Sequence, residues 1–258
     1  MQLTRRERQH LATTKEVVET ARARLREGHE VTIRAVAADM GMTAPALYRY
    51  VDSVAALEEA VAASIFDDVI AAMTTAASCY RDGDPAAELV ASAAAFRGWA
   101  LTHIHEFVTV FGRPAAPGAP ERKKGSPLAT VLTKSEGPCQ RSPGERFGAY
   151  FAGVFTRLWA ARPFPVPSRD QLDPSFLQLH QGMTGHPDAL GMLWVFEMAW
   201  ARLYGLVALE VFGHIPRPLI TSGAVFTAHM LDIGQSVGLG DEWERLRPIA
   251  LAATASTR

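Results

Sequence analysis

Cysteine is scarce in this chain of 258 residues, which contains only Cys79 and Cys139. Neither lies in a CxxC or Cys/His spacing, so a disulfide framework or a structural zinc site is not expected. A reducing compartment, the cytoplasm, is the expected location. The first ten residues, MQLTRRERQH, lack the apolar segment of a signal peptide. No uninterrupted run of 18 apolar residues exists, so no membrane span and no membrane partner are expected.

Patterns typical of strands and catalytic centres are also missing. Apolar residues recur at helical spacing along almost the whole chain, which predicts an all-α fold. There is no G-x-S-x-G turn, no P-loop and no G-x-G-x-x-G after a strand, so we expect no catalytic residue, no cofactor and no enzyme. His103 and His105 are two residues apart and do not share a helix face. With HExxH also absent, we expect no metal site.

Positive charge gathers at the N-terminal end although the net charge is −1. Residues 1–50 contain nine Lys and Arg against six Asp and Glu. Arg5, Arg6 and Arg8 lie at the very start, where a flexible arm could meet phosphates; a plain solvated terminus is the alternative.

Capping residues and apolar spacing together delimit the expected helices. Thr32, Thr43 and Ser53 are expected N-caps, and Ser142 and Glu145 are expected to form a capping box. They are predicted over about 13–27, 32–40, 43–51, 53–79, 85–111 with one break, 142–161, 187–212 and 216–237, with short helices after Asp173 and from Asp241. The Pro- and Gly-rich stretch 112–141 is predicted to be a loop. Such a loop could gate a cavity or form a surface insert, and both hypotheses stay open.

Three short helices in the first 51 residues, with a glycine turn before the third, predict a helix-turn-helix unit. The third helix is the candidate recognition helix, whose N-terminal end enters the major groove. Small side chains there allow close approach to base edges, while tyrosine and arginine can bind phosphates. The candidate DNA-binding residues are Arg34, Thr43, Ala44, Pro45, Ala46, Tyr48, Arg49 and Tyr50.

The span VTIRAVAADMGMTAPALYRYVDSVAALEEAV resembles the DNA-binding domain of the tetracycline-repressor (TetR) family, over about residues 13–62. The resemblance implies DNA contact by all the candidates above except Arg49. Two positions depart from the family pattern. Val54 stands where the family usually has a phosphate-binding lysine, and Val51 where phenylalanine is common. Loss of one phosphate contact should lower the salt dependence of binding by about one unit, unless Arg49 or the N-terminal arginines compensate.

The C-terminal part resembles the TetR subgroup named for a Trp-His-Gly motif. In AWARLYGLVALEVFGHIP, Trp200 and Gly205 match, while Tyr204 replaces the histidine. FGRPAAPGAP resembles the Phe-Gly-x-Pro loop of the same subgroup. The resemblance implies an all-helical regulatory domain, a homodimer built on the last two long helices and a ligand cavity in each subunit.

Two domains are therefore expected: a helix-turn-helix domain over residues 1–52 and a helical ligand-binding and dimerisation domain over 53–258. Aromatic side chains could line the cavity or simply pack in the core. The candidate pocket residues are Trp99, Phe107, Phe111, Phe151, Phe155, Trp159 and Trp200. The apolar helices over 187–212 and 216–237 favour a dimer, since two recognition helices must be held about one DNA turn apart.

These observations predict a ligand-responsive repressor that binds a palindromic double-stranded operator as a homodimer. Its effector is expected to be small and apolar or amphipathic, and the helix from Ser53 is expected to connect the effector to the DNA. Two alternatives remain: a ligand-independent regulator controlled by a protein partner, and a helical enzyme that retains a DNA-binding segment.

Overall fold

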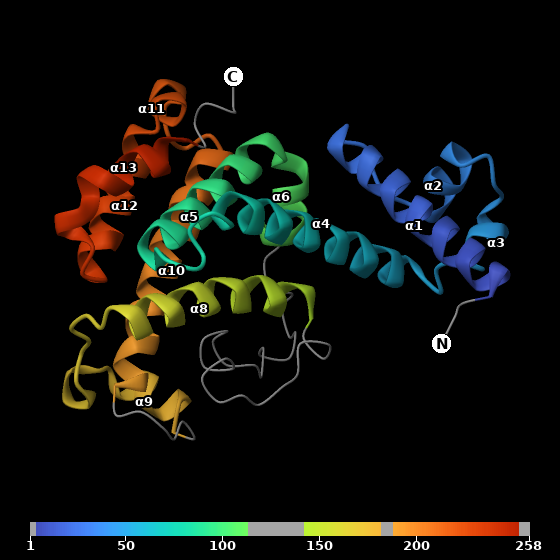
Figure 1. Ribbon diagram of the computed structural model, residues 1–258. Helices are drawn as coiled ribbons and strands as arrows, with labels where there is room; N and C mark the ends of the chain where they lie inside the picture. Colours follow the sequence, from blue (N-terminus) through green and yellow to red (C-terminus); the bar gives the residue numbers. More distant parts are fainter. Residues whose placement is uncertain (1–3, 113–141, 182–187, 253–258) are drawn as a thin grey trace. The chain divides into compact units, whose positions relative to one another are not determined.

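The computed structural model describes residues 4–112, 142–181 and 188–252. Every regular element in these ranges is a helix, and they contain no strand, which confirms the all-α prediction. The chain divides into two compact units. The first comprises residues 1–68 with 103–113, and the second comprises 69–102 with 114–258. Figure 1 shows the helices of both units. The predicted loop over 112–141 lies, from residue 113 onward, outside the described residues.

The first unit contains the three N-terminal helices and two segments that come later in the chain. These are α1 (Arg5–Arg26), α2 (Ile33–Asp39), α3 (Ala44–Leu47), the first part of α4 (Val54–Ala77) and α6 (Ile104–Phe111). Helix α1 contacts both α2 and α6, and α2 contacts α3. The core includes Val17, Val36, Leu47, Leu57 and Ile65, all with at most 1% of their surface exposed.

Helix α1 begins eight residues earlier than the sequence pattern predicted. Thr4 and Glu7 form a capping box, in which the Glu7 N–H donates to Thr4 Oγ1 at 3.2 Å and the Thr4 N–H donates to Glu7 Oε2 at 2.7 Å. This box satisfies N–H groups that otherwise have no partner in the first turn. Of the two alternatives for this cluster, the flexible arm was therefore wrong: Arg5, Arg6 and Arg8 lie, exposed, on the first turns of a helix.

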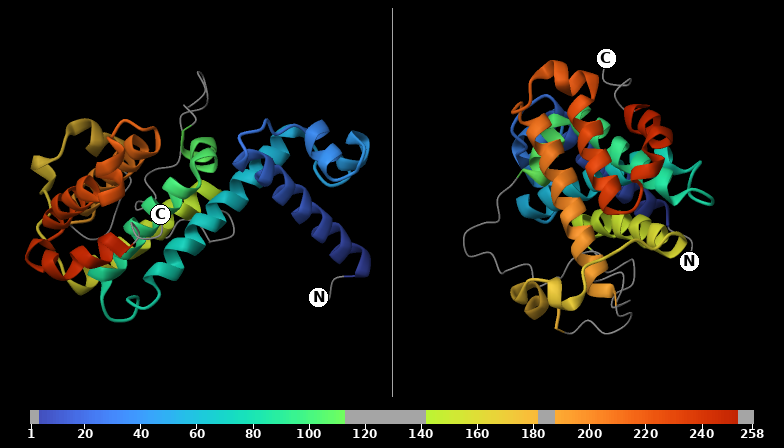
Figure 2. Two further views of the ribbon diagram at one scale, coloured as in Figure 1. Left: turned by 90° about the horizontal axis from the view of Figure 1, so that it is seen from above. Right: turned by 90° about the vertical axis from the view of Figure 1, so that its left-hand side faces the viewer.

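The second unit is a bundle arranged around α5. Its helices are α5 (Pro85–Thr102), α8 (Pro143–Ala161), α9 (Pro174–Leu179), α10 (Ala189–Val211), α11 (Arg217–Ser222), α12 (Ala224–Ser236) and α13 (Trp243–Ala252). Helix α5 contacts α8, α10 and α13, and α12 contacts α10, α11 and α13 (Figure 2). Seven alanines of α5 are buried or half-buried. Their small side chains let neighbouring helices approach on several sides.

The backbone interrupts two of the predicted helical segments, 85–111 and 216–237. The predicted break in the 85–111 segment is confirmed at His103, which separates α5 from α6. The prediction of a single helix over 216–237 was wrong, because this segment is divided into α11 and α12 at Gly223. Gly223 has φ +68° and caps both helices, a left-handed conformation that glycine adopts without steric cost.

Two helices of the described residues are long and apolar enough to cross a membrane by length and composition. These are α4, with a mean hydropathy of 1.4 over its most apolar window, and α10, with 1.3. Core helices of globular proteins share these properties. Helix α10 carries Glu210, a buried carboxylate that is ion-paired within its own unit. Its apolar surface is thus used, at least in part, for packing inside the bundle.

Candidate nucleic-acid interface and apolar cavity

The turn between α2 and α3 is fixed by local hydrogen bonds. Gly41 adopts φ +65°, and the Met42 N–H donates to the Ala37 carbonyl at 2.8 Å. Thr32 caps α2 through the Ala35 N–H at 3.2 Å, and Thr43 caps α3 through the Ala46 N–H at 3.3 Å. Both caps are those expected from the sequence. Leu47 is fully buried, so it holds α3 against the rest of the unit.

Helix α3 and the turn that follows it present an exposed surface that is rich in polar groups. Thr43, Pro45 and Arg49 are exposed, and 48% of the Tyr48 surface is accessible. Ala44 and Ala46 are half-buried between them. On α2, Arg34 is exposed as well. The structure therefore leaves these predicted DNA-binding side chains accessible in full or in part, together with the small surface that close approach to a groove requires.

Tyr50 differs from the other predicted contacts, because its ring is held by α1. It is half-buried, and it stacks on His10 with 5.0 Å between ring centroids and an angle of 25° between the rings. Residues 48–50 form a turn rather than the last part of a helix, so α3 is shorter than predicted. The sequence analysis did not single out His10. The 40-residue separation from Tyr50 leaves no local pattern that could have revealed the pair.

A buried network joins α1, α4 and α6 inside the first unit. Arg22 is 4% exposed, and it donates to Glu106 Oε1 at 2.8 Å, to Asp68 Oδ2 at 3.0 Å and to Ser64 Oγ at 3.0 Å. Arg26 Nε donates to the same Glu106 oxygen at 3.1 Å. Burial lowers the pKa of Arg22, but hydrogen bonds and charge attraction from Glu106 and Asp68 outweigh it and raise the pKa. Arg22 is thus a permanent cation in the network.

His103 lies beside this network. Asp68, His103 and Glu106 each offer a ligand atom, and the three atoms lie within 4.8 Å of one another. The sequence pattern relates His103 only to His105. His105 is instead exposed, and its ring lies near Gly28. The absence of a metal site therefore stays a prediction. The cluster went unnoticed because Asp68 is 35 residues from His103.

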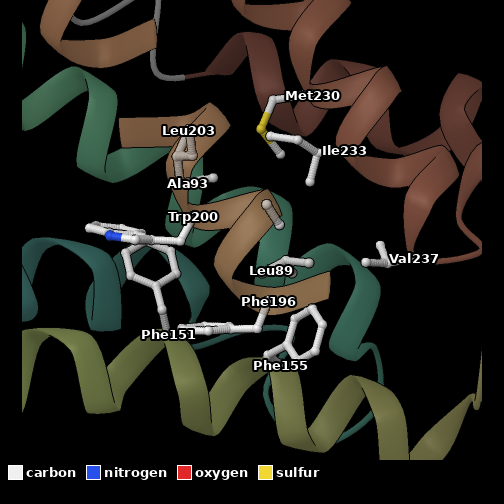
Figure 3. A pocket seen from close by; sticks show the side chains of 11 residues that line it. Leu89, Ala93, Phe151, Phe155, Phe196, Trp200, Leu203, Met230, Ile233 and Val237 are labelled. Atoms are coloured by element: carbon white, nitrogen blue, oxygen red, sulfur yellow. The ribbon is translucent and has the colours of Figure 1, made fainter. Parts of the chain in front are cut away.

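The second unit contains a small apolar cavity of about 40 Å³. It is lined by Leu89, Ala93, Phe151, Phe155, Phe196, Ala199, Trp200, Leu203, Met230, Ile233 and Val237. These residues come from α5, α8, α10 and the C-terminal end of α12, and Figure 3 shows the side chains converging on it. No charged side chain is among them. The cavity can therefore select for apolar surface but offers no ion-pair partner.

Three of the seven predicted pocket residues line this cavity: Phe151, Phe155 and Trp200. The other four lie elsewhere. Phe107 and Phe111 stack at 4.9 Å in the first unit, where Phe111 also meets Phe66 at 5.3 Å. Trp159 packs on Phe164 at 4.8 Å, and Trp99 is buried in α5. Helical spacing alone does not distinguish these core positions from cavity positions. Ligand contact by any of the seven stays a prediction.

The aliphatic residues of the cavity were missed by the sequence analysis. Leu203, Met230 and Ile233 lie on α10 and α12, where apolar residues cover much of each helix. A helix that is apolar nearly all round contains no pattern that indicates which residue faces a void.

Comparison with known proteins matches residues 89–233 to the family described as "Tetracyclin repressor-like, C-terminal domain". The HTH-type transcriptional regulator Rv1816 of Mycobacterium tuberculosis H37Rv is 28% identical over 207 residues, which cover 77% of this chain and 80% of that protein. The HTH-type transcriptional regulator Mb1846 of Mycobacterium bovis is similar to the same extent. The crystal structure of the protein SCO4313 superimposes with a TM-score of 0.61 at 24% identity, covering 89% of this chain and 98% of that one.

Proposed function

The chain belongs to the tetracycline-repressor family, and from that premise we propose that it is a cytoplasmic repressor that binds a palindromic operator as a homodimer. The observation that carries this proposal is the exposed surface of α3 and its caps. Thr43 and Pro45 at the N-terminal end and Tyr48 at the C-cap are exposed, on a helix that is fixed by the Gly41 turn and by buried Leu47. This is the arrangement that a recognition helix needs. Membership of the Trp-His-Gly subgroup stays a prediction.

Each exposed side chain suits a particular part of DNA. Arg34 and Arg49 can pair with phosphates, and Arg34 can also reach the acceptor edge of a guanine. The Tyr48 hydroxyl can donate to a phosphate oxygen. The Pro45 ring and the neighbouring alanine methyl groups can contact thymine methyls. Together these side chains bind the DNA backbone strongly, and they distinguish bases mainly by shape and apolar contact.

The proposed dimer uses apolar side chains that one protomer leaves exposed. Met198 and Leu209 of α10, Phe212 at the C-cap of α10 and Leu219 of α11 are each between 38% and 47% exposed. Exposed large apolar side chains that form a contiguous patch are typical of protein interfaces, and we propose that these residues form one. A two-fold axis through this region pairs two recognition helices, as a palindromic operator requires.

The proposed effector binds in the apolar cavity and is itself apolar or amphipathic. Cavities that hold drug-sized ligands measure roughly 300–1,000 Å³, whereas this one measures about 40 Å³. An effector must therefore displace lining side chains such as Phe151 and Trp200, and so it favours a different packing of the bundle. Helix α4 is continuous between the two units, with residues 54–68 in the first and 69–77 in the second. It is the route by which that packing change alters operator affinity.

The first test is fluorescence anisotropy with the DNA that flanks the coding region, across a salt series. The wild type should bind tightly with strong salt dependence, and Arg34→Ala with Tyr48→Ala should abolish binding. Val54, which is 45% exposed, provides a gain-of-function test. Val54→Lys should add one phosphate contact and steepen the log–log salt slope by about 0.9.

A matched control distinguishes the effect of this phosphate contact from the effect of the added positive charge. Leu179 is 75% exposed and lies on α9 of the second unit, so Leu179→Lys adds the same charge outside the unit that carries the proposed interface. Its salt slope should equal that of the wild type. Equal slopes for Val54→Lys and Leu179→Lys, or full binding by the Arg34/Tyr48 double variant, would refute the proposed interface.

A further inference from the structure

We propose that Asp68, His103 and Glu106 form a binding site for a divalent transition-metal ion of the zinc type. The three side chains come from separate parts of the first unit. Asp68 lies on α4, His103 precedes α6 as its N-cap residue, and Glu106 lies in the first turn of α6. One ligand atom from each lies within 4.8 Å of the other two.

The spacing suits an ion after a small adjustment. Zinc lies about 2.0–2.2 Å from imidazole nitrogen and carboxylate oxygen, which places the ligand atoms roughly 3–3.6 Å apart. The three side chains must therefore close by little more than 1 Å, which a rotation of the half-buried Asp68 and His103 side chains can supply. Because both are half-buried, an ion and a water molecule can also reach the site from solvent.

Glu106 provides the independent indication of a missing partner. Its side chain is fully buried, and both arginine donors bind one of its oxygens, Oε1. The second oxygen, Oε2, is buried without a hydrogen-bond partner among the described residues. A buried carboxylate oxygen without a partner is costly, and such atoms in native structures call for a missing water or ion. A metal ion coordinated by Oε2 satisfies it without disturbing the contacts of Oε1.

Charge determines which ion can bind and how tightly. Arg22 and Arg26 balance Asp68 and Glu106, so a divalent cation adds uncompensated positive charge. Magnesium and calcium, which require mostly oxygen ligands and several carboxylates, are disfavoured, whereas imidazole favours zinc, cobalt and nickel. Arg26 can relieve the repulsion, because its side chain is 44% exposed and can move toward solvent. Arg22, which is buried, cannot.

A consequence follows for regulation, and it rests on the proposed function, whereas metal binding itself does not. Release of Arg26 from Glu106 removes one of the two links from α1 to α6. Helix α1 also supports the predicted DNA-binding unit through its contact with α2. Metal occupancy is thus a second input to operator affinity, separate from the apolar cavity.

The test is titration of metal-free, full-length protein with Zn²⁺ by calorimetry and with Co²⁺ by visible absorption. The wild type should bind one ion per chain and develop the Co²⁺ ligand-field bands of a low-coordinate site. His103→Gln should weaken binding by about tenfold or more, since even residues that only orient metal ligands change affinity about 10–100-fold. His105→Gln is the matched control, because His105 is exposed on the same helix and outside the cluster, and it should bind like the wild type.

Asp68→Asn gives a second ligand variant, and circular dichroism shows whether each variant is folded. Glu106→Gln is less suitable, because it also removes the charge that pairs with Arg22 and Arg26. The proposal is overturned if the wild type binds neither ion, if folded His103→Gln and Asp68→Asn bind like the wild type, or if both histidine variants lose binding equally. Operator binding measured without metal is independent of these outcomes, so failure here leaves the proposed function untouched.

Discussion

Arg97 of α5 and Glu210 of α10 form a doubly hydrogen-bonded ion pair whose side chains are 1% and 0% exposed. Arg97 Nε donates to Glu210 Oε2 at 2.6 Å, and Nη2 donates to Oε1 at 2.9 Å. Nη2 also donates to the Ile220 carbonyl at 2.6 Å, and the guanidinium lies 5.0 Å from the Phe226 ring centroid. One side chain therefore holds together four helices, α5, α10, α11 and α12.

Removing one member of this pair should strongly destabilise the second unit. Glu210→Ala leaves a buried guanidinium without its counter-charge, and we expect the free energy of unfolding to fall by about 3–5 kcal/mol. The double variant Arg97→Met, Glu210→Met replaces both charges by apolar groups and should lose less. Urea unfolding followed by circular dichroism measures both. A double variant that is less stable than Glu210→Ala would contradict this account.

Two glycines of α10 should respond oppositely to alanine. A Cβ at Gly191 would lie 2.3 Å from the Pro167 carbonyl oxygen, which is backbone and cannot easily move, so Gly191→Ala should destabilise the protein. At Gly205 a Cβ meets nothing within 4 Å, and Gly205→Ala should stabilise the helix by about 0.5–1 kcal/mol. Thermal unfolding of the two variants side by side tests the pair. Equal shifts in Tm would show that the close approach at Pro167 does not matter.

Stability should rise with pH through the titration of His180. Burial lowers the pKa of His180 below 6.5, although the nearby Glu197 carboxylate raises it in part. The unfolded chain therefore takes up a proton at a higher pH than the folded protein. The contribution of neutral His180 to the free energy of unfolding is fully present above about pH 6.5, and it is lost as the pH falls toward the folded-state pKa. The free energy of unfolding, measured from pH 5 to 7.5, should show a steeper slope for the wild type than for His180→Gln; identical slopes would exclude this contribution.

Leu47, the last residue of α3, and its C-cap Tyr48 should have different roles. Leu47 is fully buried, so Leu47→Ala should cost about 2–5 kcal/mol of stability in the first unit. Tyr48 is 48% exposed, and Tyr48→Ala should change stability by less than about 0.5 kcal/mol while it weakens operator binding. Hydrogen exchange of the α2 and α3 amides reports the local effect. Similar exchange in the two variants would mean that Leu47 does not anchor α3.

Local chemistry accounts for the part of the structure that the sequence predicted. Thr32, Thr43 and Ser53 act as N-caps through backbone N–H groups three residues later, and the Ser142–Glu145 capping box opens α8 as predicted. These interactions join residues within one helical turn, so they can be recognised from short patterns. The same type of pattern was available at Thr4 and Glu7, where it was overlooked.

Contacts between distant segments were not predictable in this way. Arg22 looks like an ordinary residue of a surface helix, yet it is buried against Glu106, 84 positions away. Aromatic spacing likewise predicted both Phe107 and Phe151 as pocket residues, although of these two only Phe151 lines the cavity. Each of these outcomes depends on which helix face another helix covers. Helical periodicity identifies the apolar face but not its neighbour.

The sequence by itself thus determined the all-helical fold, the capped α2–α3 turn and the exposed residues of the candidate recognition helix. Backbone hydrogen bonding and short-range capping fix those features within a few residues. Only the tertiary structure decided the Arg97–Glu210 pair, the cavity lining and the Asp68–His103–Glu106 cluster. Burial makes these distant groups neighbours and removes the water that would otherwise serve as their partner, so their chemistry exists only after the helices have packed.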